Sequence, residues 1–171
     1  NKFDQHKKIE DNKVPLILWN HRWEFDKNAE TFFNVLFKLK DNNIDFELAV
    51  VGEQFKEYPK IFDKAKKLLN SNIVQFGFCE SFDEYAKFLW KADIIPVTSN
   101  QDFFGASIME AVYCNTIPLL PKQLTYPDLF QINENPQFFY ENEDDLINKL
   151  GSFIENIDKI QNQNLSGIAE K

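Results

Sequence analysis

Apolar runs of strand length recur along the chain, and segments with a different hydrophobic pattern separate them. Within each run the apolar residues follow one another without alternation, which is typical of strands that are buried on both faces of a sheet. Five such strands are predicted, at residues 14–19, 46–52, 72–76, 93–97 and 116–120.

The segments between these runs carry apolar residues at a helical period of 3.6, which predicts amphipathic helices. The period is clearest in two groups, Ile61, Phe62, Ala65, Leu68 and Leu69, and Phe82, Tyr85, Leu89 and Ala92. Local signals agree, because Ser81 is followed three residues later by Glu84, as in a capping box. Asn42 and Asn43 are expected to end a helix that begins near Asn28.

Strands and helices therefore alternate, and right-handed crossovers of this length favour a mostly parallel sheet. The predicted fold class is α/β: a three-layer, Rossmann-like domain with helices on both faces of the sheet. Ligands of such sheets bind at the carboxyl ends of the strands, so functional residues are expected directly after the strands.

The two ends of the chain differ from its middle. Residues 1–13 are polar and charged, and we interpret them as a linker from a missing N-terminal domain. Residues 14–160 are expected to form the domain itself. Its last helix would have one apolar face, made of Leu146, Ile147, Leu150, Phe153, Ile154 and Ile157. Residues 161–171 are expected to be a loosely ordered polar tail.

Composition excludes several classes of protein. The net charge of −8 argues against a surface built to neutralise nucleic-acid phosphates, although a local basic strip stays possible. Cys79 and Cys114 lack the spacing of metal ligands and indicate small buried residues in a reducing, cytoplasmic protein. No apolar run approaches the length of a membrane span.

Two cations follow the first predicted strand, in the segment NHRWEFDKN. Arg22 offers a planar fork and Lys27 a point charge, and together they could hold a diphosphate. Two solvated charges are the alternative, because exposed charges are the rule. His21 and Trp23 could shape a pocket here or simply pack over the loop.

The stretch TSNQDFFGASIMEAVYCN follows the fourth predicted strand. Gly105 is placed where a helix begins, and helix starts present unpaired N–H groups and a positive dipole end to anions. Asp102 and Glu110 could accept hydrogen bonds from sugar hydroxyls. The alternative makes Asp102 a helix cap and Glu110 a solvated helix residue.

The R-x4-K segment and the acid-x7-Glu segment together resemble the C-terminal domain of the group 1, or family 4, glycosyltransferases. These enzymes have the two-domain GT-B fold, so this chain would be its C-terminal half. More narrowly, the blocks HRWEFDKN, DFFGASIMEAVYCN and PLLPKQLTYPDLF are similar to the tRNA-queuosine mannosyltransferases. That narrower family attaches mannose from GDP-mannose to queuosine in tRNA.

The resemblance implies a role for each matching residue. Arg22 and Lys27 would bind the donor diphosphate, Glu110 the nucleotide ribose, and Asp102 hydroxyls of the donor sugar. Residues near the helix start would face the sugar and phosphate, while the loop of residues 77–80 would contact the base. The implied substrate-binding set thus also contains Phe104, Gly105, Ala106, Ser107, Gly77 and Phe78.

The resemblance further implies a retaining hexosyl transfer that needs no metal and no cofactor, because cationic side chains and the helix start stabilise the leaving diphosphate. The acceptor, for which tRNA is the candidate, would bind mainly to the missing N-terminal half, and this chain alone would be inactive.

Two residues depart from the family pattern. Asp102 replaces a commoner glutamate, and Asn115 stands where a glycine usually ends the helix, although asparagine tolerates that left-handed conformation. The first change leaves open a degenerate nucleotide-sugar-binding or interaction module without transferase activity. A related epimerase or phosphorylase on the same two-domain plan is a further alternative.

Overall fold

The computed structural model describes residues 1–7, 11–161 and 165–169. Within them, six parallel strands form one sheet in the order β3-β2-β1-β4-β5-β6. The strands are β1 Leu16–Trp19, β2 Glu47–Val50, β3 Ile73–Phe76, β4 Ile94–Pro96, β5 Ile117–Pro121 and β6 Phe139–Tyr140. The five predicted strands and the parallel α/β fold are confirmed. Strand β6 was missed, because two residues are too few to give a periodic signal.

Strand β1 lies at the centre of the sheet and pairs with β2 on one side and β4 on the other. The chain first builds outward through β2 and β3 and then crosses to the other side of β1, so the strand order reverses between β1 and β4. The carboxyl ends of two strands that diverge in this way leave a crevice, where ligands of doubly wound sheets bind.

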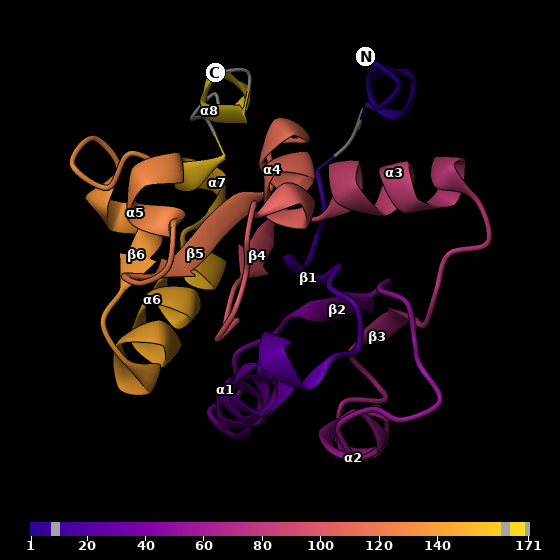
Figure 1. Cartoon of the computed structure of the whole chain (residues 1–171). Helices are drawn as coiled ribbons and strands as arrows, with labels where there is room; N and C mark the ends of the chain where they lie inside the picture. Colours follow the sequence, from indigo (N-terminus) through magenta and orange to yellow (C-terminus); the bar gives the residue numbers. More distant parts are fainter. Residues whose placement is uncertain (8–10, 162–164, 170–171) are drawn as a thin grey trace.

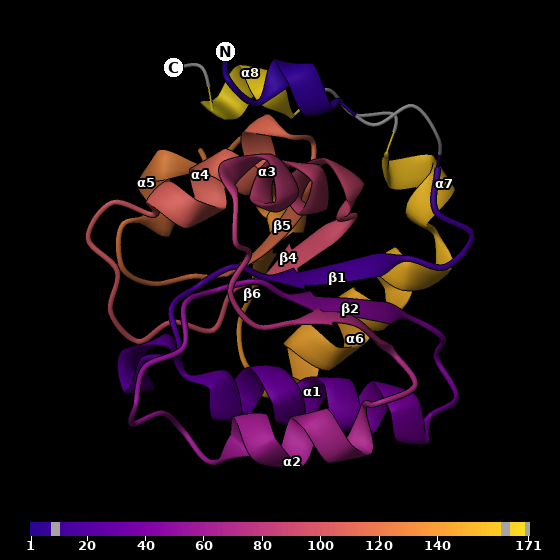
Figure 2. The same cartoon turned by 90° about the vertical axis from the view of Figure 1, so that its right-hand side faces the viewer.

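Helices cover both faces of the sheet, as Figures 1 and 2 show. Helices α1, α2 and α6 lie on one face, and α3, α4 and α5 lie on the other. The helices are α1 Ala29–Asp41, α2 Ile61–Leu68, α3 Phe82–Lys91, α4 Ala106–Tyr113, α5 Tyr126–Leu129, α6 Glu143–Glu155, α7 Ile157–Ile160 and α8 Ser166–Ala169, with 3-10 turns η1 Asp4–His6, η2 Phe25–Lys27 and η3 Pro136–Phe138. The single last helix of the prediction is thus divided at Asn156 into α6 and α7.

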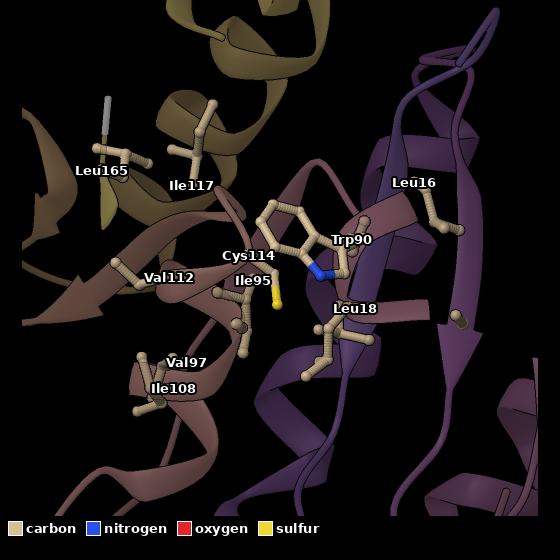
Figure 3. Packing of buried hydrophobic residues seen from close by; sticks show 14 of the residues in the cluster. Leu16, Leu18, Trp90, Ile95, Val97, Ile108, Val112, Cys114, Ile117 and Leu165 are labelled. Carbon is tan, nitrogen blue, oxygen red and sulfur yellow. The ribbon is translucent and has the colours of Figure 1, made fainter. Parts of the chain in front are cut away.

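The side chains of β1 explain why its apolar run is continuous. Ile17 and Trp19 pack with α1, α2 and α6, whereas Leu16 and Leu18 pack with the helices of the opposite face. All four side chains are fully buried. Figure 3 shows the buried cluster on the face covered by α3, α4 and α5, in which Leu18 and Trp90 lie close to Ile95 and Cys114. Both faces of the strand therefore need apolar residues, as the sequence pattern indicated.

The predicted helix boundaries are confirmed. The Asn28 side chain accepts a hydrogen bond from the Thr31 amide at the start of α1, and Asn43 adopts a left-handed φ of 57° just past its end. At α3, the Ser81 hydroxyl accepts a bond from the Glu84 amide over 3.2 Å, and the Glu84 carboxylate accepts one from the Glu80 amide. These caps hold the amino end of α3 at the carboxyl edge of the sheet.

Residues 1–7 and 165–169 pack over the face covered by α3 and α4 (Figures 1 and 2). Phe3 is buried, and its carbonyl oxygen accepts a hydrogen bond from the Trp90 indole at 2.6 Å. Leu165 is buried too, and α8 lies against α4. Residues 1–7 and 165–169 therefore pack on the folded body, through the buried side chains of Phe3 and Leu165. The assignment of residues 1–13 to a linker and of residues 161–171 to a polar tail stays a prediction. The rest of both segments, residues 8–10, 162–164 and 170–171, lies outside the described residues.

Candidate functional site

The candidate site lies at the carboxyl edge of the sheet, around the point where β1 and β4 diverge. The loop after β1, with η2, meets the loop that joins β4 to α4. The Asn100 amide donates to the Asp26 carbonyl over 2.8 Å, and the Thr98 hydroxyl donates to the Asn28 carbonyl over 2.9 Å. Two segments about 70 residues apart in the chain are thereby fixed against each other.

Asn20 and His21 connect the end of β1 to the first turn of α4. The Asn20 amide group donates to the Ser107 carbonyl over 2.8 Å and to the Tyr85 hydroxyl over 3.3 Å. The His21 Nδ1 lies 3.0 Å from the Ser107 hydroxyl. These contacts place the start of α4 directly beside the carboxyl end of β1.

The His21 side chain is buried, and its surroundings disfavour the charged form. Burial lowers the pKa of His21 to about 4, and the nearby Lys27 ammonium also lowers it. The imidazole is therefore neutral at physiological pH. Gly52, after β2, lies so close that an added Cβ would meet the His21 carbonyl oxygen at 1.6 Å. Only glycine lets the ends of β1 and β2 approach in this way.

The helix start that the sequence predicted is present. Gly105 has a φ of 59°, in the left-handed region, and immediately precedes α4. The first amides of a helix have no acceptor inside it, so those that follow Gly105 are available to an anion. Asn115, past the end of α4, also adopts a left-handed φ, of 64°, as expected.

Asp102 uses both carboxylate oxygens within the protein. One accepts a hydrogen bond from the Gly105 amide over 3.0 Å, and the other accepts one from the Tyr126 hydroxyl over 2.8 Å. Burial and this carboxylate raise the pKa of Tyr126 well above its usual range. Asp102 thus supports the loop before α4, and each oxygen keeps a second lone pair for a further donor.

The two predicted cations differ in their surroundings. The Arg22 side chain is 62% exposed, and its only ion pair within the described residues is with Glu24 at 3.4 Å. The Lys27 side chain is 15% exposed and its ammonium group donates to the Gln101 carbonyl over 3.1 Å. Lys27 is therefore held beside Asp102, while Arg22 is free to move toward a ligand.

A cavity of about 350 Å³ opens between the loops after β1, β2 and β3 and the start of α3. Its lining combines Arg22 with the backbone of Gly52 and the side chains of Glu53, Phe78, Glu80 and Tyr85. The Phe78 side chain is 64% exposed. An exposed aromatic ring, one cation and two carboxylates suit a ligand with a flat ring and several hydrogen-bond donors.

Glu110 reaches this cavity through Tyr85. The Tyr85 hydroxyl donates to a Glu110 carboxylate oxygen over 2.8 Å, and Glu110 is partly buried. Burial, together with the Glu110 charge, raises the pKa of Tyr85 well above its usual range, so the phenol keeps its proton. The hydroxyl therefore acts as a donor that fixes the Glu110 carboxylate.

The predicted site residues fall into two neighbouring groups. Arg22 and Phe78 line the cavity, and Glu110 adjoins it through Tyr85. Around the start of α4 lie Lys27, Asp102, Phe104, Gly105, Ala106 and Ser107. Gly77, which lies between the end of β3 and Phe78, has a φ of 132°, a conformation that favours glycine. The Phe104 side chain is 82% exposed, so it takes little part in the contacts of either group.

Other residues in the predicted segments have structural roles. Trp23 stacks on Phe62 with ring centroids 4.0 Å apart, so its ring packs over the loop. Cys79 and Cys114 are buried, as expected, and burial raises the pKa of each thiol, to about 11 and about 12. Neither thiol is therefore ionised at neutral pH.

Sequence reasoning missed three residues that build the site, namely Gly52, Tyr85 and Tyr126. Tyr85 was interpreted only as part of an apolar helix face, although a tyrosine on such a face often brings its hydroxyl to a polar partner. Gly52 carried a usable signal, because a glycine directly after a buried strand often marks a close backbone approach. Tyr126 carried none, since its partner is 24 residues away.

Within the described residues, no three His, Cys, Asp or Glu side chains come together as metal ligands would. In the same part of the chain, no helix has the length and apolar character that crossing a membrane requires.

Comparison with known proteins identifies relatives of this architecture. The family model for glycosyl transferases group 1 matches residues 1–170. A curated tRNA-queuosine alpha-mannosyltransferase from Drosophila melanogaster is 35% identical over 143 residues, which cover 84% of this chain but only 37% of that protein. The chain thus spans little more than a third of this relative.

Solved structures of similar proteins share the fold. The C-terminal domain of a group 1 glycosyl transferase, LpcC, from Francisella tularensis has a TM-score of 0.75 at 18% identity, covering 98% of this chain and 88% of that one. The catalytic domain of a cholesterol-alpha-glucosyltransferase from Helicobacter pylori has a TM-score of 0.71 at 20% identity, covering 92% and 99%. At these identities the likeness concerns the fold alone.

Proposed function

Since this chain belongs to the glycosyl transferases group 1 family, we propose that it is the half of a hexosyltransferase that holds a nucleoside diphosphate sugar. The observation that carries the proposal is the position of the cavity at the carboxyl edge of the sheet, where it adjoins the start of α4 at the β1–β4 divergence. A nucleoside would occupy the cavity, and its diphosphate would extend toward the helix start.

The diphosphate would be held by positive groups on three elements. Arg22 lines the cavity, Lys27 lies beside the loop that precedes α4, and the first amides of α4 supply the positive end of a helix dipole. Each charge-assisted hydrogen bond contributes on the order of 1.5–3 kcal/mol. These groups would stabilise the diphosphate as it leaves, so the transfer would need neither a metal nor a cofactor.

The remaining polar groups would orient the donor. Glu110, fixed by Tyr85, would accept hydrogen bonds from the ribose hydroxyls. The free lone pairs of Asp102 would accept bonds from the sugar, which would sit over Gly105 and Ala106. The ring of Phe78 and the backbone of Gly77 would contact the base. In this arrangement no side chain of the chain acts as a nucleophile, in keeping with a retaining transfer by positioning.

The finer substrate assignment is mannose from GDP-mannose, with queuosine in tRNA as the acceptor. The 35% identity to a tRNA-queuosine alpha-mannosyltransferase supports it. Because that relative is much longer than this chain, the acceptor would bind mainly to a second domain, and the reaction would take place in the cytoplasm. This chain by itself would bind the donor without turning it over.

Thermal unfolding of the chain with GDP, GDP-mannose, UDP and UDP-glucose tests the proposal. At a hundredfold excess over Kd, a bound nucleotide stabilises the fold by about 2.7 kcal/mol, which raises Tm by several degrees. We expect the guanine nucleotides to give the larger shifts. If none of the four raises Tm at millimolar concentration, the chain is a degenerate module rather than a donor-binding domain.

A further inference from the structure

Helix α2 and the turn before it carry a concentration of positive charge in an otherwise acidic chain. Residues 56–67 contain five lysines and two acidic residues, whereas the whole chain has a net charge of −8. The lysines are Lys56, Lys60, Lys64, Lys66 and Lys67, and all five are exposed. One of the two acids, Asp63, already accepts a hydrogen bond from the Tyr58 hydroxyl.

Three of these lysines lie along one face of the helix. Lys60, Lys64 and Lys67 follow a spacing of four and three residues, which places them along one outward ridge. Phe62 and Ala65 are buried on the opposite side, so the ridge faces away from the core. The predicted donor site uses none of these three lysines.

A second hollow, of about 420 Å³, adjoins this ridge. Lys60 and Lys64 line one side, Glu30 and Asn34 of α1 line another, and the Phe25 ring of η2 borders it. The Phe25 side chain is 69% exposed, although it is large and apolar. Since η2 also carries Lys27, the hollow is next to the proposed donor site.

We propose that this hollow and the α2 ridge bind a single-stranded part of the RNA acceptor, the rest of which would contact the second domain. Backbone phosphates would contact Lys60 and Lys64, and an unpaired base would stack on Phe25. Lysines beside an exposed aromatic ring are the chemistry of single-stranded nucleic-acid sites, in which the cations track the phosphates and the ring supports a base. The inference rests on the proposed function only in taking the acceptor to be an RNA.

An acidic peptide is a less suitable occupant. It would leave the Phe25 ring, which is 69% exposed, without a flat partner. RNA supplies a flat base for this ring, and at the edge of a base the Glu30 carboxylate can accept hydrogen bonds while the Asn34 amide can donate and accept them.

The test uses the whole gene product that contains this chain and a fluorescein-labelled tRNA that carries queuosine. The variant is Lys60→Gln with Lys64→Gln, and the matched control is Lys87→Gln with Lys91→Gln. Both pairs are exposed lysines spaced four residues apart, and the control pair lies on α3, across the sheet. Anisotropy titrations at several salt concentrations give the affinity for RNA and its salt dependence.

We expect the α2 variant to weaken tRNA binding by about tenfold or more and to lower the slope of log K against log salt by about 2, since each lost phosphate contact removes about 1. Phe25→Ala should weaken binding without changing the slope. Donor affinity for GDP-mannose should stay unchanged in every variant. In steady state, the α2 variant should raise KM for tRNA and leave kcat nearly as it was.

Equal losses in the α2 variant and the α3 control would overturn the inference, because they would show an effect of net charge alone. An unchanged tRNA affinity in the α2 variant, or displacement of the tRNA by poly-glutamate but not by unlabelled RNA, would overturn it as well. A protein that binds no GDP-mannose in the parallel titration would instead contradict the proposed function.

Discussion

The floor and the rim of the candidate site are built in opposite ways. The floor, defined as Asn20, His21, Gly52, Tyr85 and Ser107, consists of groups that contact one another or neighbouring backbone, and Asn20 and His21 are almost fully buried. The rim, defined as Arg22, Phe78, Phe103 and Phe104, consists of side chains that are more than 60% exposed.

This difference indicates which part of the site exists before any ligand arrives. The hydrogen bonds of the floor set the spacing between β1, α3 and α4, so mutations there should act first on stability. The rim has large side chains without comparable support, so mutations there should act on binding and leave the fold intact.

The largest effect is expected at Gly52. In Gly52→Ala, the new Cβ would overlap the His21 carbonyl oxygen, so the ends of β1 and β2 must separate. We expect the free energy of unfolding to fall by at least about 4 kcal/mol, measured by urea denaturation of the chain.

The control for Gly52 is Gly77→Ala at the rim. A Cβ at Gly77 would meet nothing within 4 Å, and only its φ of 132° opposes the substitution. Its cost should be about 1–3 kcal/mol. A similar loss in both variants would mean that the close approach at Gly52 does not hold the floor together.

The next effect is a dependence of stability on pH that arises from His21. Its pKa is about 4 in the folded chain and 6.5 when the imidazole is exposed to water, so the unfolded chain binds more protons between these values. The contribution of the neutral His21 imidazole to the free energy of unfolding is therefore complete above pH 6.5, and it is lost as the pH falls toward 4. It amounts to about 3 kcal/mol.

Urea unfolding of wild type and His21→Asn between about pH 4 and 7 measures this contribution. The acidic groups titrate in both proteins, so the difference between the two curves isolates His21. That difference should shrink as the pH falls. Parallel curves would show that the imidazole is not held in its neutral form.

A smaller effect, on binding alone, is expected at the two cations. Arg22→Ala and Lys27→Ala should each weaken the binding of GDP and of GDP-mannose by on the order of 1.5–3 kcal/mol, or tenfold and upward in Kd. Both ligands are affected because both carry the diphosphate. Calorimetric titration of the full-length enzyme measures it. Arg22→Ala should leave the unfolding free energy unchanged, since that side chain is 62% exposed. Full affinity for GDP in either variant would remove that residue from the diphosphate site.

The smallest effect separates two roles of Asp102. Tyr126→Phe removes one of its hydrogen bonds and should lower stability by about 1 kcal/mol, with GDP affinity unchanged. Asp102→Ala should lower stability similarly. It should also weaken the binding of GDP-mannose more than that of GDP, because the remaining lone pairs of the Asp102 carboxylate would bind the sugar. Equal losses for the two ligands would show that Asp102 only supports the loop.

The sequence predicted those parts of the molecule that depend on local patterns. Continuous apolar runs indicated five strands, and Gly105 and Asn115 marked the two ends of α4, because a left-handed backbone restricts which residues fit there. The parallel fold followed from the alternation of elements. The resemblance, which covers most of the chain, is confirmed by the family match.

The sequence could not predict contacts between distant segments. Tyr85 and Glu110 are 25 residues apart, and Asp102 and Tyr126 are 24 apart, so no periodicity connects them. The packing of residues 1–7 was missed for the same reason, since a single Phe3 in a polar stretch gives no sign of the Trp90 side chain that it contacts. The roles assigned to the individual site residues stay predictions.

Hydrogen–deuterium exchange of the chain with and without GDP-mannose tests most directly whether this edge of the sheet binds the donor. The account predicts slower exchange in residues 77–82 and 104–108, which border the cavity and the start of α4, and no change in α6 on the opposite face. Slower exchange elsewhere, with residues 77–82 and 104–108 unchanged under saturating ligand, would contradict it.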